Sequence, residues 1–146
     1  MTPKPTANIS LQQEASVAVL RAAGLIRRSV AGLLQGYSLT PPQYNVLRIL
    51  RGATEPLPTM EIAARLVDEE PGITRLIDAL EGADLVKRAR SDSDRRRVDC
   101  RITKKGLKTL REIDRPIDDL DSRLFGCTAN KDLKQIVRMM SSIRVE

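Results

Sequence analysis

The side chains best placed to do chemistry in this 146-residue sequence are arginines, and many of them lie close together. Residues 87–101 hold seven basic side chains against three acidic ones. The whole chain has a formal net charge of +6 and an isoelectric point near 9.7. A local excess of positive charge attracts phosphate groups, so this stretch indicates a polyanionic partner.

Other kinds of chemistry lack the residues they need. The sequence contains no histidine, which excludes a His-dependent general base, a His-containing triad and an imidazole metal site. Cys100 and Cys127 are too few for a Cys-only zinc site in one chain or for a secreted disulfide framework. We find no phosphate loop and no nucleophile–base pair. We therefore expect neither an enzyme nor a bound cofactor or metal.

Length and composition favour one soluble domain with an aliphatic core. Hydrophobic residues make up 41% of the chain and charged residues 30%, whereas aromatic residues make up only 2%. No apolar run approaches the roughly 18 residues of a membrane span. The first five residues are not followed by the apolar segment of a signal peptide. We expect a cytoplasmic protein that does not contact membranes.

The elements before the basic stretch are predicted to be helices. Residues 1–8 contain two prolines and no periodicity, so we interpret them as a flexible arm. Residues 9–34 have helical periodicity with a thin polar face, which indicates burial on more than one side. Thr40 suits the N-cap of a second helix that ends at Gly52, and Gln43 completes a capping box.

Two further helices and a hairpin follow. Residues 56–58 are expected to form an extended linker, and Thr59 to cap a short helix over residues 60–66. Pro71 opens a fourth helix whose apolar residues recur at i, i+3, i+4 and i+7. Strands over residues 85–90 and 97–102 flank a polar turn, and the second strand alternates with Cys100 on its apolar side.

The C-terminal part is predicted to be two helices. Thr103 caps a long helix that Pro116 should kink and Gly126 should end. A last helix begins near Asn130 and has Leu133, Ile136, Val137, Met140 and Ile143 on its apolar face. The fold class is thus mainly α (α+β), with three short helices and a basic hairpin forming a winged helix-turn-helix. A helix fits the major groove of duplex DNA, and a basic hairpin tip fits the minor groove.

Five segments in this order resemble the multiple antibiotic resistance regulator (MarR) family of bacterial transcription factors. They are residues 39–47, 72–81 and 84–88, then Asp94-Arg95-Arg96 in the hairpin, and residues 102–106. The resemblance implies a homodimeric regulator, usually a repressor, that binds pseudo-palindromic operators. Residues 39–103 would form the DNA-binding lobe of a single domain spanning 9–146. Residues 9–36 and 104–146 would form the dimerisation body.

The helix from Pro71 would read the DNA, and the hairpin would serve as the wing. The residues expected at the DNA are Gly72, Thr74, Arg75, Arg88, Arg90, Asp94, Arg95, Arg96 and Arg97. Each arginine could instead be a solvated surface charge. The resemblance implies that Asp94 and Arg96 brace the wing through an ion pair. Arg97 stands where the family often has glycine, so this wing could turn differently.

The dimer and an effector are the other expected partners. The residues expected in the dimer interface are Val17, Leu20, Leu110, Leu120, Leu133, Ile136 and Met140. The resemblance also implies a small aromatic or phenolic effector near Tyr37 and Tyr44, although both tyrosines could be ordinary packing residues. We expect Cys100 to be a buried structural thiol, and Cys127 to lie in a loop.

A second class of function stays open. A winged helix can lose DNA binding and serve as a protein–protein interaction module. The balanced charge of residues 40–103 and the acidic run 68–70 beside the reading helix favour that alternative, whereas the basic wing argues against it. The salt dependence of binding to duplex DNA separates the two hypotheses.

Overall fold

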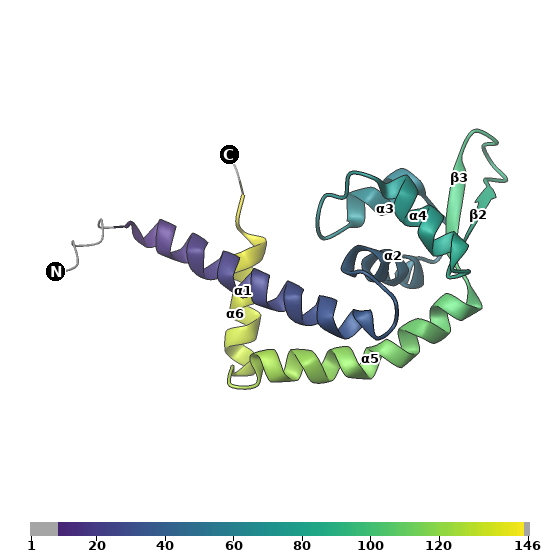
Figure 1. Ribbon diagram of the computed structural model, residues 1–146. Coiled ribbons are helices and arrows are strands. Elements are labelled where there is room, and N and C mark those ends of the chain that lie inside the picture. Colours follow the sequence, from purple (N-terminus) through teal and green to yellow (C-terminus); the bar gives the residue numbers. More distant parts are fainter. Residues whose placement is uncertain (1–8, 145–146) are drawn as a thin grey trace, which may run out of the picture.

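The computed structural model describes residues 9–144 and shows a helix-rich chain with one small antiparallel sheet (Figure 1). The arm expected at residues 1–8 lies outside the described residues. The expected fold class, a mainly α winged helix-turn-helix, is confirmed. The elements in chain order are α1 (Leu11–Gln35), α2 (Pro41–Gly52), β1 (Leu57–Pro58), α3 (Thr59–Arg65), α4 (Ile73–Gly82), β2 (Val86–Arg90), β3 (Val98–Ile102), α5 (Lys104–Phe125) and α6 (Asn130–Ser141).

Side-chain caps begin three of the helices. The predicted capping box of α2 is present, with Thr40 accepting from the Gln43 backbone and Gln43 accepting from the Thr40 backbone. Ser10 and Gln13 make the same reciprocal pair at the start of α1. Thr103 caps α5, as predicted, by accepting from the Gly106 N–H at 3.0 Å.

Three local predictions were wrong. Helix α4 begins at Ile73 rather than Pro71, because its N-cap Gly72 has a φ of 138°, a conformation that favours glycine. Thr59 is the first residue of α3 rather than its cap. Residues 57–58 of the expected linker form an edge strand, where a proline without an N–H is tolerated.

The sheet has the order β1-β3-β2. In the antiparallel β2–β3 pair, Arg88 lies opposite Cys100, and Lys87 lies opposite Arg101. Neighbouring residues therefore point to opposite faces of the sheet. Cys100 faces the core and is fully buried, as predicted. The pair formed by β1 extends only over Cys100 and Asp99, so the outer part of the wing is a two-stranded ribbon.

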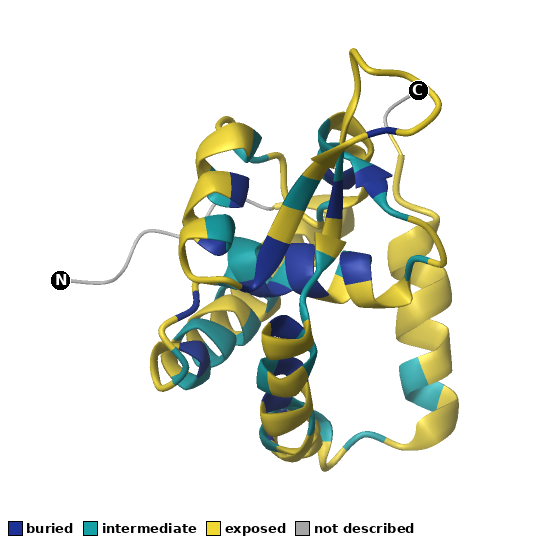
Figure 2. Ribbon diagram, turned by 90° about the vertical axis from the view of Figure 1, so that its right-hand side faces the viewer, coloured by how far each residue is buried: buried dark blue, intermediate teal, exposed yellow. Residues whose placement is uncertain are grey.

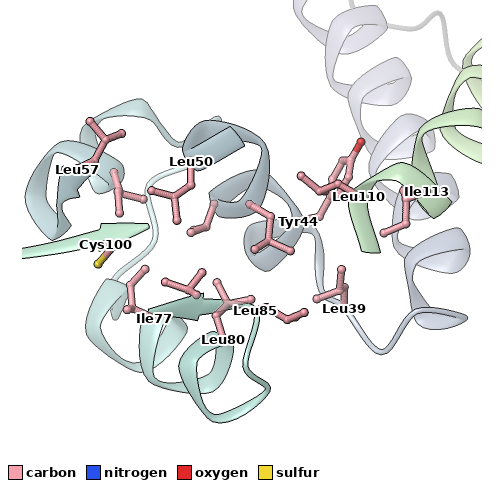
Figure 3. Packing of buried hydrophobic residues seen from close by; sticks show 14 of the residues in the cluster. Leu39, Tyr44, Leu50, Leu57, Ile77, Leu80, Leu85, Cys100, Leu110 and Ile113 are labelled. Carbon is pink, nitrogen blue, oxygen red and sulfur yellow. The ribbon is translucent and has the colours of Figure 1, made fainter. Parts of the chain in front are cut away.

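One continuous core joins the winged lobe to the long helices (Figure 3). Ile77 and Leu80 of α4 pack in the same cluster as residues of α2 and of the sheet. Leu34 from the end of α1 and Leu110 from α5 belong to that cluster as well. The lobe, the end of α1 and the first half of α5 therefore form one packed unit.

Gly106 is required where α5 approaches the base of the wing. A Cβ at this position would come within 2.4 Å of the Leu85 carbonyl oxygen and 2.7 Å of Ile102 Cγ1. Both distances are shorter than van der Waals contact, so a larger residue would push α5 away from the sheet.

Helix α5 runs through Pro116 without interruption and bends along its length (Figure 1). Pro116 has no N–H to donate to the carbonyl of Glu112, four residues earlier. The Tyr37 hydroxyl, in the turn after α1, donates to that carbonyl at 3.3 Å. The tyrosine thus supplies a hydrogen bond that the proline removes from the helix.

The ends of the molecule remote from the lobe expose apolar side chains. Helix α6 buries no residue in the single chain, and Figure 2 shows it almost entirely in the exposed colour. On α1, Leu20 is 71% exposed. Among the described residues, no helix has both the length and the apolar character needed to cross a membrane.

Candidate functional site

Helix α4 presents a polar face beside the wing. Ile77 and Leu80 bury one side of the helix, which leaves Thr74, Arg75, Asp78 and Ala79 exposed on the other, as the periodicity predicts. Arg75 forms no ion pair within residues 9–144. Its guanidinium group is available to a ligand that approaches this face.

The wing tip is held by backbone hydrogen bonds. The Ser91 N–H donates to the Arg97 carbonyl, and the Arg97 N–H donates to the Asp94 carbonyl, each at 2.9 Å. Ser91, which is buried, shares a 3.0 Å hydrogen bond with the Ser93 hydroxyl. These bonds close the turn, so the arginines at its tip are carried on a defined scaffold.

The ion pair expected between Asp94 and Arg96 is absent from the described residues. Instead, the Asp94 carboxylate accepts the backbone N–H of Arg96 at 2.9 Å, because an Asp side chain bonds its own turn two residues on. Arg97 pairs with Asp99 on β3 at 2.9 Å. Arg95 and Arg96 are exposed, and neither side chain forms an ion pair within residues 9–144.

Arg88 is the best-anchored arginine of the wing. Its backbone N–H donates to Glu81 Oε2 at 2.7 Å, and its guanidinium bonds Glu81 Oε1 and Asp78 Oδ1. Hydrogen bonds from Arg88 lower the pKa of Glu81, and those to Asp78 and Glu81 raise the pKa of Arg88. The Arg88 side chain is thus engaged inside the chain, and its expected contact with phosphate stays a prediction.

Arg90 and the outer face of the wing complete the basic surface. Arg90 is exposed and has no ion-pair partner among the described residues. Arg90 also contributes to the lining of a cavity of about 300 Å³, together with Lys87, Asp99 and Arg101. Lys87 and Arg101 were not among the predicted site residues, although strand alternation and the register place them side by side.

A second cavity, of about 320 Å³, lies between the lobe and the long helices. Most of its lining is apolar and comes from α1, α2, α5 and the loop before α4; the apolar and aromatic members are Ile26, Val30, Pro41, Pro42, Tyr44, Leu66, Val67 and Ile117. Tyr44 lines it, whereas Tyr37 does not and bonds the Glu112 carbonyl instead. Burial raises the pKa of Tyr44, and Arg48 stacks 5.7 Å from the centre of its ring.

Two ion pairs connect the lobe to the helices around this cavity. Arg27 of α1 bonds Asp68 of the loop before α4 at 2.7 Å, and both side chains are more than half exposed. Arg51 of α2 contacts both carboxylate oxygens of Asp114 on α5, at 2.8 and 2.9 Å. Asp68 is the first residue of the acidic run 68–70, which precedes α4.

Some of the residues expected in the dimer interface are buried inside the single chain, and the others are exposed or half-buried. Leu110 is fully buried and Leu120 is nearly so, because α5 packs them inside the single chain. The expectation that these two leucines face a partner is therefore corrected. The other members of that set are exposed or half-buried: Val17, Leu20, Leu133, Ile136 and Met140.

The two cysteines lie in different environments. Cys100 is fully buried, and burial raises its thiol pKa. The Thr59 hydroxyl lies 3.8 Å from its sulfur. Cys127 is exposed in the turn between α5 and α6. Within residues 9–144 no group of three or more His, Cys, Asp or Glu side chains is arranged to hold a metal ion.

The known proteins that this chain resembles are transcriptional regulators. A family model described as the MarR family matches residues 39–98. The curated protein TtmR of Methylorubrum extorquens (strain PA1), an HTH-type transcriptional regulator, is 38% identical over 97 residues, which are 66% of this chain and 49% of that protein. The chain thus spans about half the length of that relative.

Solved structures match over nearly the full length. A MarR transcription factor from Planctomyces limnophilus is 33% identical, with a TM-score of 0.71 and coverage of 94% of this chain and 100% of that one. The transcriptional repressor CouR bound to a 23-mer DNA duplex is 26% identical, with a TM-score of 0.80 and coverage of 93% and 98%. CouR also appears with p-coumaroyl-CoA, in a structure from Rhodococcus jostii RHA1.

Proposed function

The chain belongs to the MarR family of transcriptional regulators, and from that membership we propose that it is a sequence-specific DNA-binding repressor that acts as a homodimer. The observation that carries the proposal is the pairing of two exposed basic elements on one packed core. Arg75 projects from the reading helix, and Arg95 and Arg96 occupy the wing tip.

The two elements suit different grooves. An α-helix fits the major groove, where an arginine can bond the edge of a guanine through two hydrogen bonds. The wing tip suits the minor groove, whose negative potential attracts arginine. We propose Arg75 as a base contact, Arg95 and Arg96 as minor-groove and phosphate contacts, and Arg90 as a phosphate contact. We propose that Gly72 and Thr74, at the start of α4, contact the DNA backbone.

The proposed dimer follows from the apolar surface of α1 and α6. Val17 and Leu20 on α1, and Ile136 and Met140 on α6, are each at least 40% exposed in the single chain. An obligate dimer of this kind buries more than about 2,000 Å² in total. Two-fold symmetry then places the reading helices about one duplex turn apart, so the half-sites of the operator should be centred roughly 10 bp from each other.

We propose the cavity beside Tyr44 as the site of a small aromatic or phenolic effector. Its apolar walls suit a ring, and the Tyr44 hydroxyl and the Arg48 guanidinium offer hydrogen bonds. Tyr37 is removed from the proposed site because it does not line this cavity. The p-coumaroyl-CoA complex of CouR shows that a neighbour of this fold binds a ligand containing a phenolic group.

The test begins with selection of preferred sequences from randomised duplexes by the full-length protein. Affinity for the selected duplex and for a scrambled one is then measured by fluorescence anisotropy at several salt concentrations. Arg75→Ala should weaken binding to the selected duplex by about 1–3 kcal/mol and leave the scrambled duplex nearly unchanged. Arg95→Ala should weaken both, and flatten the salt dependence by about one unit of slope.

A matched control is Arg138→Ala on α6, an exposed arginine remote from the wing along the chain. It should leave both affinities and the slope unchanged. If the wild-type protein shows no preference for any selected sequence, or if Arg95→Ala leaves affinity and salt slope unaltered, the proposal fails. The protein-interaction alternative is then favoured.

A further inference from the structure

The contact between Arg88 and Glu81 joins the two elements that are proposed to read DNA. Arg88 belongs to strand β2 of the wing, and Glu81 belongs to the reading helix α4. The Glu81 carboxylate accepts the Arg88 backbone N–H at 2.7 Å, its Nε at 3.3 Å and its Nη2 at 3.2 Å. Nη2 also donates to Asp78 of α4. One carboxylate therefore holds both the main chain and the side chain of the strand.

The wing needs such an anchor because its outer end extends beyond the third strand of the sheet as a two-stranded ribbon. Strand β1 pairs only with Cys100 and Asp99, so no third strand supports the wing beyond that point. A two-stranded ribbon is marginally stable by itself. Arg88 lies opposite Cys100, one residue before the last position that β1 supports on the way to the tip. Its contact with α4 thus fixes the base from which the ribbon extends.

The helix end of the contact lies close to the proposed base contact. Residues 75, 78 and 81 are spaced three apart, so Arg75, Asp78 and Glu81 lie along one side of α4. The guanidinium of Arg88 engages the two acidic members of that row. The contact therefore begins one helical turn from Arg75. A tilt of the wing about its base would change the spacing between Arg75 and the wing tip.

We propose that Glu81 and Arg88 are positioning residues that hold the reading helix and the wing at the spacing of adjacent grooves, without contacting DNA themselves. The inference rests on the proposed function, since it assigns these residues a part in sequence discrimination. A correctly spaced pair of contacts forms without reorganisation when the selected duplex binds. Binding to a scrambled duplex depends on charge and needs no such spacing.

The direction in which Glu81→Gln changes DNA affinity separates a positioning role from simple charge repulsion. A carboxylate near a polyanion opposes binding, so its neutralisation ordinarily increases affinity for every sequence. If Glu81 positions the wing, Glu81→Gln instead weakens binding to the selected duplex. Glu69→Gln is the matched control. It makes the same chemical change just before the same helix, at an exposed residue without an ion pair in the described part of the chain.

The experiment measures affinities of full-length variants for the selected and scrambled duplexes against salt concentration, with thermal unfolding followed by circular dichroism. Glu81→Gln should weaken binding to the selected duplex about tenfold and change binding to the scrambled one less than twofold. Glu69→Gln should strengthen binding to both by a similar, small factor. Arg88→Gln should weaken binding like Glu81→Gln and keep the wild-type salt slope, whereas Arg90→Gln should lower the slope by about one unit.

Two results overturn the positioning role in a protein that still discriminates between the duplexes. In the first, Glu81→Gln behaves like Glu69→Gln. In the second, Arg88→Gln weakens binding to both duplexes equally and lowers the salt slope, which identifies a phosphate contact. If Arg88→Gln does not fold, the Glu81 arm decides, because it changes only a carboxylate to an amide. If the wild-type protein does not discriminate, the proposed function fails first and the positioning role fails with it.

Discussion

The hydrogen bond between Tyr37 and the Glu112 carbonyl should stabilise the protein only because Pro116 is present. Pro116 cannot supply the N–H that a regular helix would offer to that carbonyl, and the Tyr37 hydroxyl takes its place at 3.3 Å. Tyr37→Phe removes the donor and little else. A net hydrogen bond contributes about 0.5–1.5 kcal/mol to stability. Because 3.3 Å is long for an O–H donor, we expect a loss of about 0.5–1 kcal/mol.

A double-mutant cycle with Pro116→Ala tests whether the Tyr37 hydrogen bond depends on the proline, because this second change restores the helical donor. Pro116→Ala provides an N–H that can bond the Glu112 carbonyl within the helix. In that background Tyr37→Phe should cost close to nothing, so the coupling between the two changes should equal the cost of Tyr37→Phe alone. Urea unfolding at one fixed protein concentration gives the four free energies, since the stability of a dimer depends on concentration.

Tyr44→Phe is the control for this cycle. The Tyr44 hydroxyl makes no hydrogen bond with any residue from 9 to 144, so the same chemical change there should lie within about 0.5 kcal/mol of wild type. An equal cost of Tyr37→Phe with and without Pro116 would show that the hydroxyl does not replace the missing helical donor. A cost of Tyr44→Phe as large as that of Tyr37→Phe would also contradict this role of the Tyr37 hydroxyl.

Three further predictions concern packing, thiol reactivity and assembly. Gly106→Ala should destabilise the protein by about 1–3 kcal/mol in urea, because its new methyl group has no room against the base of the wing. In a Cys127→Ser background, Cys100 should react with iodoacetamide only after unfolding, since burial blocks the thiol and raises its pKa. Because the folded state holds the Cys100 proton more tightly than the unfolded state, the protonated thiol contributes to the free energy of unfolding. This contribution is fully present at neutral pH and is lost as the pH rises through the raised pKa. Ile136→Glu should sediment near 16.2 kDa, whereas Lys134→Gln, the same change in charge on the opposite side of α6, should sediment as a dimer.

The elements that depend on local chemistry were predictable from the sequence. Thr40 and Gln43 satisfy the first N–H groups of α2 within one turn, and Thr103 does the same for α5. The alternation in β3 placed Cys100 in the core because strand side chains alternate regardless of tertiary contacts. The exposed face of α4 followed from helical periodicity for the same reason.

Features that depend on distant residues were not predictable. Residues 57–58 became a strand because β3 offered an unpaired edge, and nothing in their own composition indicates this. The ion pairs of Arg88 were not predicted, because the sequence does not show that Asp78 and Glu81 lie within its reach. Their spacing of three on the reading helix was the available signal.

The prediction that two residues of α5 lie in the dimer interface was wrong for a related reason. Leu110 and Leu120 are on an apolar stripe, and a stripe does not say whether it faces the chain's own core or a partner. In this fold the first half of α5 supports the winged lobe, and Leu110 belongs to that packing. The exposed apolar residues of α1 and α6, such as Leu20 and Ile136, have no such support within the described chain, so they carry the proposed dimer.

The position of the second cavity limits how an effector could act. Its lining joins α1 and α5 to α2 and to the loop that leads into α4, so a ligand there contacts the body and the lobe together. A ligand changes DNA affinity only by its difference in affinity for the two arrangements of the lobe, and a tenfold change requires about 1.4 kcal/mol. The exposed pair Arg27–Asp68 contributes about 0–1 kcal/mol. Its loss alone would not suffice, so the coupling needs further contacts that differ between the two arrangements. Val67, on the loop before α4, is an apolar lining residue that is 82% exposed and so has surface that a ligand could bury.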